Sequence, residues 1–185
     1  MAGNVNAQVV VTARYASGQI ATAAGQIAAA QGIDAVFIPE QADGMPAVAS
    51  ALGSANVKTQ FLGTGVWNDA RVLKLPQMQG AWFSAPDNSG FDAFAQRYKA
   101  KFNSDPARLA TLAYDAVTLA AALAHNGGAD SFNQAALTNI SGFNGADGVF
   151  RFRADGTNER GLAVMEIGDG DAKVISPAPR SFAAG

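Results

Sequence analysis

The sequence contains no cysteine and a single histidine, and each shortage excludes a class of chemistry. Without cysteine the chain has no disulfide, no thiolate metal ligand and no cysteine nucleophile. One histidine makes a zinc site improbable, and His125 stands near the end of an alanine-rich stretch, where a cation suits the dipole of a helix C-terminus. No apolar run approaches the ~20 residues that span a bilayer, so this segment predicts no insertion into a membrane.

Positive charge is also sparse. The 13 Lys and Arg residues are scattered along the chain and the net charge is −2, so the clustered basic surface of a nucleic-acid-binding protein is missing. Apolar residues, by contrast, make up 49% of the 185 residues. This is enough to bury a core, either as one domain or as two small ones.

Strand-like and helix-like segments alternate over the first half of the chain. The β-branched run at 8–15 predicts a strand, and the short apolar stretches at 34–39 and 57–63 predict two more. Between them, 18–31 and 44–55 have the composition of helices. This order predicts an α/β fold, with a parallel sheet flanked by helices and with ligand groups at the carboxyl ends of its strands.

The second half has a different pattern. Aromatic residues at helical spacing predict a helix over 91–103, and further helices are predicted over 105–128 and 131–140. The tail alternates apolar and polar residues around two Asp-Gly dipeptides that are typical of hairpin turns. Gly156 and Gly170 should therefore have positive φ.

Capping residues mark several helix boundaries. Ser17 and Asp130 precede two of the predicted helices, where a side-chain oxygen can accept a free backbone N–H. Asp105 and Pro106 open the alanine-rich segment, and proline fits the first turn of a helix. The long helix is thus predicted to begin at Pro106.

Three loops follow predicted strands, at 39–44, 63–69 and 84–90. The middle one, GTGVWND, lacks the third glycine of a dinucleotide fingerprint and the Lys-Ser/Thr of a phosphate loop. The serines of the third loop have no neighbouring base for a catalytic triad. The stretch 168–172, GDGDA, fits a turn between strands better than a calcium loop. These residues support no enzymatic activity, no metal and no cofactor.

Three stretches, in order, resemble the type I periplasmic solute-binding proteins of the leucine/isoleucine/valine-binding group. Residues 13–69, with DAVFI and KTQFLG, are similar to the second lobe of that family. Residues 91–124 resemble its aromatic-spaced helix and the AYDAV helix that follows. Residues 142–167 resemble its closing hairpin. The resemblance covers nearly the whole chain.

The resemblance implies a fold of two α/β lobes with ligand bound between them. It also implies that the protein is not an enzyme. It assigns 1–84 and 144–185 to lobe two and 85–143 to a helical remainder of lobe one. It also implies that a signal peptide and the first strands of lobe one are missing, so the chain alone should bind ligand weakly. The helices would then leave apolar side chains partly uncovered, among them Phe94, Tyr98, Leu112 and Leu119.

The same resemblance implies a ligand cleft lined by Glu40, Gln41, Thr64, Gly65, Trp67 and Tyr114. Gly65 stands about where amino-acid-binding members carry the acidic residue that holds the ligand's ammonium. A buried ammonium without a charged partner is costly, which argues against a free amino acid as the ligand. Trp67 has two interpretations, either stacking on a ligand or covering the end of the sheet.

Two functions follow from the resemblance. The first is the substrate-binding component of an ABC transporter, which closes by hinge motion on a small polar or amino-acid-like solute and delivers it to a membrane permease. The second is that of the penicillin-binding-protein activators, lipoproteins that use this fold to contact a cell-wall synthase. The absent acidic residue and the tail from Glu159 to Phe182 favour the second. Both imply the periplasm, and neither involves nucleic acid.

Overall fold

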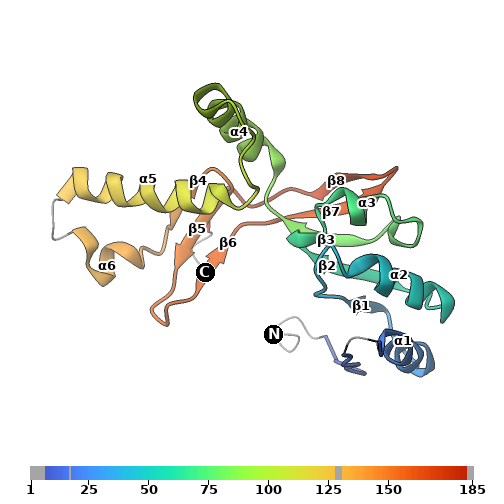
Figure 1. The fold of residues 1–185 in the computed structure, drawn as a ribbon. Coiled ribbons are helices and arrows are strands. Elements are labelled where there is room, and N and C mark those ends of the chain that lie inside the picture. Colours follow the sequence, from blue (N-terminus) through green and yellow to red (C-terminus); the bar gives the residue numbers. More distant parts are fainter. Residues whose placement is uncertain (1–6, 17, 128–130, 183–185) are drawn as a thin grey trace. The chain divides into compact units, whose positions relative to one another are not determined.

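The computed structural model describes residues 7–16, 18–127 and 131–182, which belong to two compact units (Figure 1). Unit 1 takes the chain up to Ala85 together with Met165–Ile175, and unit 2 takes Pro86–Val164 and the chain from Ser176 onward. The strands between residues 143 and 160 form a separate sheet within unit 2, and the chain returns to unit 1 at Met165. The assignment of these segments to two lobes stays a prediction.

Unit 1 is built on a sheet with the strand order β1-β2-β3-β7-β8 (Figure 1). The strands are β1 (Ala35–Phe37), β2 (Gln60–Thr64), β3 (Trp82–Ala85), β7 (Ala163–Gly168) and β8 (Asp171–Ser176). The first three are parallel, with Val36 opposite Phe61 and Gly63 opposite Phe83. The predicted α/β fold with a parallel sheet is confirmed.

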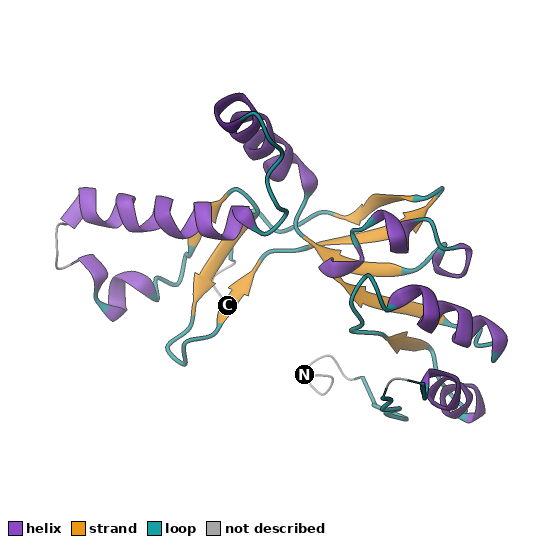
Figure 2. Cartoon of the chain, in the orientation of Figure 1, coloured by secondary structure: helices purple, strands orange, loops and turns teal. Residues whose placement is uncertain are grey.

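Two helices cover one face of this sheet. They are α2 (Met45–Ser54) and the short α3 (Ala70–Leu73), which lie over the strands in Figure 2, and α1 (Ile20–Ala29) packs against α2. Met45, Val48 and Leu52 of α2 are buried, as are Phe61 and Phe83 of the strands. On the other face, Phe37, Leu62 and Trp82 stand in one cross-strand row, and Phe37 and Trp82 are 59% and 38% exposed.

The predicted first strand does not form. Between Ala7 and Ala16 the structure assigns no strand, and Val9 and Val10 are largely exposed. β-branched residues favour an extended backbone, but a strand also needs a neighbouring row of N–H and C=O groups to pair with. Residues 8–15 have the propensity of a strand, but they have no neighbouring strand to pair with. This part of the prediction is therefore wrong.

Unit 2 combines three helices with a three-stranded antiparallel sheet. Its helices are α4 (Asn88–Phe102), α5 (Ala110–Gly127) and α6 (Gln134–Leu137), and its strands are β4 (Phe143–Gly145), β5 (Gly148–Phe152) and β6 (Asn158–Arg160). Asp87 caps α4 by accepting the N–H of Ser89 at 2.8 Å, and Asn103 ends it with a left-handed φ of 52°. None of the helices in the described ranges has the length and apolarity needed to cross a membrane.

Two helix predictions need correction. The long helix begins at Ala110 rather than at Pro106, because Asp105 is paired with Lys99 and Arg108 turns towards Asp147. The third helix shortens to α6, which is capped by the Asn133 side chain on the N–H of Ala136. The proposed cap residues Ser17 and Asp130 lie outside the described residues.

The two hairpin turns are confirmed. Gly156 has φ 83° and Gly170 has φ 77°, the left-handed conformation that glycine adopts without steric cost. Asp169, the first residue of its turn, also has a positive φ of 57°, as a two-residue hairpin with a type I′ turn requires.

The helices of unit 2 are unequally covered. Phe94 is buried at 6% exposure, Tyr98 and Leu119 are half-buried, and Leu112 is 47% exposed. The outward side of α5 is therefore apolar and open. On α4, Phe94 packs 5.2 Å from the ring of Tyr114, whereas Phe102 is 55% exposed.

Gly63 provides a test of the packing in unit 1. A Cβ at this position would lie 2.3 Å from Cδ2 of the Trp67 indole, so we expect Gly63→Ala to destabilise the protein by ~1–3 kcal/mol. The matched control is Gly25→Ala in α1, which has nothing within 4 Å and should stabilise by ~0.5–1 kcal/mol. Urea denaturation followed by tryptophan fluorescence reports on unit 1, which contains both tryptophans. Equal stability of the two variants would contradict this packing.

Candidate functional site

The polar residues predicted to form a site follow neighbouring parallel strands. Glu40 and Gln41 come after β1, and Thr64 ends β2 and leads into a 3-10 turn over Gly65–Trp67. Thr64 also pairs with Ser84 near the end of β3. Because parallel strands end at the same edge of a sheet, these groups share the carboxyl edge of unit 1. Tyr114, by contrast, lies on α5 in unit 2.

Both carboxylate oxygens of Glu40 are engaged by the chain itself. The Tyr15 hydroxyl donates to Oε2, and the backbone N–H of Gln41 donates to Oε1 at 2.8 Å. The side chain folds against Gly44 at the start of α2, where an added Cβ would come within 2.7 Å of the carboxyl carbon. Partial burial of the phenol, together with the bond to Glu40, raises the pKa of Tyr15 to about 12. Gln41 is exposed and Thr64 half-buried.

Trp67 is enclosed by its own unit. Its side chain is 0% exposed, and its ring packs against Gly63 and against Phe83, whose ring centroid is 6.5 Å away. Within unit 1 this geometry agrees with Trp67 as a cover for the end of the sheet, because no ring face is exposed for stacking. The indole Nε1–H finds no acceptor among the described residues.

The loop after β2 offers no unengaged carboxylate. Gly65 has no side chain and brings the backbone close to β3, so that an added Cβ would lie 3.3 Å from the Ser84 carbonyl oxygen. Asp69 caps α3 by accepting the N–H of Arg71 at 2.9 Å, and it pairs with the Arg71 guanidinium at 2.8 Å. These bonds from Arg71 lower the pKa of Asp69 to about 2.

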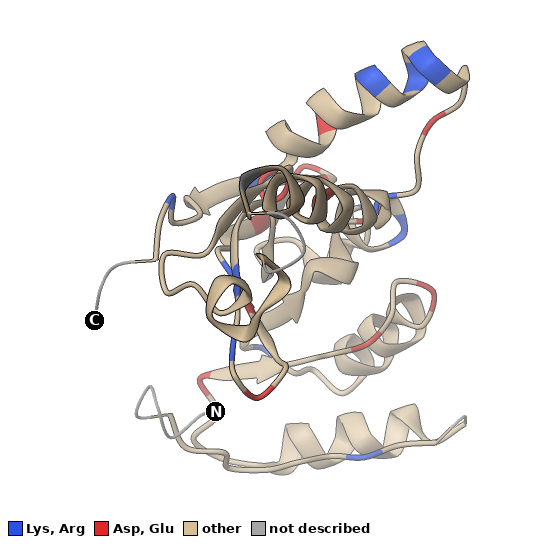
Figure 3. Ribbon diagram, turned by 90° about the vertical axis from the view of Figure 1, so that its left-hand side faces the viewer, with Lys and Arg blue, Asp and Glu red and all other residues tan. Residues whose placement is uncertain are grey.

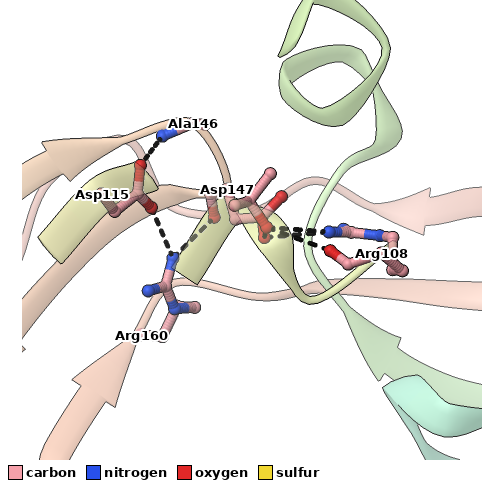
Figure 4. Close-up of polar contacts among 6 residues, drawn as sticks. Arg108, Asp115, Ala146, Asp147 and Arg160 are labelled. Carbon is pink, nitrogen blue, oxygen red and sulfur yellow. Dashed lines mark hydrogen bonds and ion pairs between the residues drawn. The ribbon is translucent and has the colours of Figure 1, made fainter. Parts of the chain in front are cut away.

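Unit 2 contains a buried charged cluster that the sequence prediction missed (Figure 4). Asp147 accepts from the Arg108 guanidinium at 2.9 Å and from the Thr111 hydroxyl at 2.6 Å. Asp115 accepts the Ala146 N–H at 2.6 Å and faces Arg160 at 3.6 Å. The cluster of Arg108, Asp115, Asp147 and Arg160 is called the acid–arginine cluster here. Both carboxylates are only 4% exposed, and each is balanced by a guanidinium.

The acid–arginine cluster joins α5 to the turn between β4 and β5. A Cβ at Gly145 would lie 2.2 Å from Oδ2 of Asp115, and one at Gly90 would lie 1.6 Å from the Ala146 carbonyl oxygen, so the turn is tightly held. A signal for it existed in the sequence, since Asp115 is the one charged residue in the alanine-rich and leucine-rich stretch from Leu109 to Ala124. Buried charges of this kind are paired, which predicts partners elsewhere in the chain.

A second, more exposed group of charges lies on the antiparallel sheet of unit 2, where Glu159 pairs with Arg151 at 2.9 Å and with Arg153 at 3.0 Å. Figure 3 shows the charged residues spread over the described elements. Arg97, Lys99 and Lys101 lie on α4. Within the described ranges, no group of three His, Cys, Asp or Glu side chains is arranged to hold a metal ion.

Comparison with known proteins gives one family match. The periplasmic binding protein family matches residues 1–172. No curated protein matches the chain.

Several solved structures share the fold. The leucine binding protein LivK from Thermotoga maritima has a TM-score of 0.67 and 18% identity, over 94% of this chain and 53% of its own. A putative branched-chain amino acid ABC transporter protein from Rhodospirillum rubrum has a TM-score of 0.70 and 17% identity, over 91% and 52%. A solute binding protein from R. palustris in complex with benzoate has a TM-score of 0.62 and 20% identity, over 96% and 53%. The chain thus spans about half the length of each.

The enclosure of Trp67 leads to a stability prediction. Trp67→Ala should reduce the free energy of unfolding by ~3–5 kcal/mol, because it leaves a large cavity under the sheet end. Trp82→Ala is the control, since that ring is 38% exposed and should cost much less. Urea denaturation followed by circular dichroism measures both. A loss below ~1 kcal/mol for Trp67→Ala would show that the ring is not part of the core.

The Tyr15–Glu40 bond leads to a titration prediction. In a Tyr98→Phe, Tyr114→Phe background Tyr15 is the one remaining tyrosine, and its absorbance should titrate near pH 12. Glu40→Gln should lower that pKa towards 10 by removing the carboxylate, whereas Glu166→Gln should leave it unchanged. Because the folded pKa is raised, the stability from this contact is present below pH 10 and is lost as the pH rises through about 12. A Tyr15 pKa near 10 in the parent would contradict the bond.

Proposed function

The chain belongs to the periplasmic binding protein family, and on that premise we propose that it is the ligand-binding part of a non-enzymatic solute receptor that serves an ABC transporter. The observation that carries the proposal is the parallel sheet of unit 1, which brings Gln41, Thr64 and Gly65 to one carboxyl edge within a chain that matches this family. In open α/β sheets such an edge is where ligands bind. The proposal places the protein in the periplasm, with a membrane permease as its partner.

In this proposal the strand-end residues of unit 1 contact the solute, and Tyr114 on α5 of unit 2 is a separate proposed contact. The chain spans about half the length of the solved neighbours. Hinge closure of the two lobes on a small ligand is the proposed mode of action.

The chemistry of the edge favours a solute without a free ammonium group. Both oxygens of Glu40 are bonded within the chain, Asp69 is engaged by Arg71, and Gly65 has no side chain. At the end of β2 a buried ammonium would therefore lack a charged partner, and its desolvation would be costly. The exposed amide of Gln41 and the hydroxyl of Thr64 suit a small polar solute instead. The benzoate held by one solved neighbour shows that this fold accommodates a ligand with no ammonium.

A second candidate function is contact with a cell-wall synthase, as in the penicillin-binding-protein activators. The observation that favours it is the same engagement of Glu40 and Asp69, because an edge whose acids are used internally has less to offer a charged solute. In that case the edge of unit 1 is a protein contact surface. The two functions differ in whether any small solute stabilises the protein.

A thermal-shift screen tests the proposal. The panel compares free amino acids, the corresponding amides and small carboxylic acids at concentrations up to the millimolar range. A ligand at 100 times its Kd stabilises the folded state by ~2.7 kcal/mol, and we expect this for compounds without a free ammonium. Gln41→Ala should weaken binding about tenfold, the loss of one hydrogen bond, while Gln31→Ala on the exposed turn after α1 should not.

Two results would count against it. If no compound raises the melting temperature, the solute-receptor proposal fails and the contact function is favoured. If free leucine stabilises the protein as strongly as its amide, the inference about the ammonium group is wrong.

A further inference from the structure

The C-terminal half of α4 carries a local excess of positive charge that the proposed solute site does not use. Arg97, Lys99 and Lys101 lie within five positions, and in Figure 3 the basic residues of α4 gather towards the end that leads into the next loop. Lys99 is paired with Asp105 at 3.1 Å. Arg97 and Lys101 are exposed, and no carboxylate of the described residues lies within ion-pair distance of either. The helix dipole favours cations in the last turn, which accounts for Lys99 and Lys101 but not for Arg97.

An exposed aromatic ring stands beside these cations. Phe102 ends α4 and is 55% exposed, and the centre of its ring lies 4.6 Å from that of Tyr98. The Lys101 ammonium lies 5.4 Å from the centre of the Phe102 ring, and the Arg97 guanidinium lies 5.8 Å from that of Tyr114. Side chains that are already held by a neighbour lose less conformational freedom when a partner binds. Arg97, Lys101 and Phe102 are called the cationic end of α4 here.

The small number of charges decides which kind of partner fits. A nucleic-acid surface needs many more phosphate contacts than two cations can make. An anionic bilayer gains only ~1 kcal/mol from each Lys or Arg near it, and the net charge of −2 repels the chain as a whole. Two carboxylates on a protein surface match the two cations in number, and an apolar side chain beside them covers the ring.

We propose that the cationic end of α4 is a docking surface for an acidic segment of a partner protein. Carboxylates of the partner pair with Arg97 and Lys101, and an apolar side chain of the partner packs on Phe102. Because these ion pairs form at the surface, their strength falls as the salt concentration rises. The surface is built from unit 2 residues alone and stands whether or not the edge of unit 1 binds a solute.

A pair of peptides tests the chemistry of the partner. The probe is a fluorescein-labelled peptide of the sequence Glu-Glu-Leu-Leu-Glu-Glu, and its control is Gln-Gln-Leu-Leu-Gln-Gln with the same label. In a fluorescence-polarisation titration we expect the acidic peptide to bind with a Kd of ~10⁻⁴ M and the neutral one to bind at least about fivefold more weakly. The difference should shrink between about 20 and about 200 mM NaCl. Equal affinities, or no binding of the acidic peptide up to ~1 mM protein, would overturn the proposal.

Two double variants test the location with the same change in net charge. Arg97→Gln with Lys101→Gln should weaken the acidic peptide at least about fivefold, because both ion pairs are lost. The control is Arg14→Gln with Lys58→Gln, which removes one exposed Arg and one exposed Lys of unit 1 and should keep the affinity within about twofold. An equal loss in both variants would show that the peptide responds to net charge alone, and unchanged binding in the first would show that it binds elsewhere.

The ring and the competing partner have their own tests. Phe102→Ser should weaken the acidic peptide about threefold and leave its salt dependence unchanged, since the ring contributes packing and not charge. Vesicles of phosphatidylcholine with about one third phosphatidylglycerol should not carry the protein to the top of a flotation gradient. Binding to these vesicles that Arg97→Gln with Lys101→Gln abolishes would assign the surface to a membrane and overturn a protein partner.

Discussion

Parallel pairing of β1, β2 and β3 is the constraint on which the rest of unit 1 depends. Parallel strands cannot be joined by tight hairpins, so each connection must travel back along the sheet, and the chain does this with α2 and with the short α3 and its flanking turns. The helices then bury the face that carries Phe61 and Phe83. The same geometry sends the loops after the parallel strands to one edge, which is why residues more than twenty positions apart, such as Gln41 and Thr64, belong to one proposed site.

Much of this was readable in the sequence because hydrophobic periodicity and turn chemistry are local. The Asp-Gly turns at Gly156 and Gly170, the parallel strands and the helices of unit 1 followed from residues within a few positions of each other. The failures share a different cause. Residues 8–15 lack a pairing partner, and the start of the long helix is displaced because Arg108 binds Asp147, 39 residues away. The residues near a segment in the sequence do not reveal contacts that it makes, or fails to make, with distant parts of the chain.

The proposed site was likewise predictable in part. Its place at the edge of the sheet follows from topology, but the state of its side chains does not. Trp67 looks like a loop tryptophan in the sequence, yet Gly63 leaves the space in which the ring packs. Glu40 looks like an available carboxylate, yet Tyr15 reaches it from 25 residues away. The lining residues Gln41, Thr64, Gly65 and Tyr114 therefore remain part of a proposal about ligand contact, while the packing around Trp67 is a property of the fold.

The cross-strand row of Phe37, Leu62 and Trp82 has a consequence for how the protein behaves in solution. Parallel sheets are usually covered on both faces, and here this row is partly open to solvent. Sulfate and phosphate strengthen the effective burial of apolar surface because they are excluded from it. These salts therefore favour contact between the exposed sheet faces of two molecules, and the solubility of the protein falls as the salt concentration rises. Dilute buffers that lack strongly excluded anions are the conditions in which unit 1 stays dispersed.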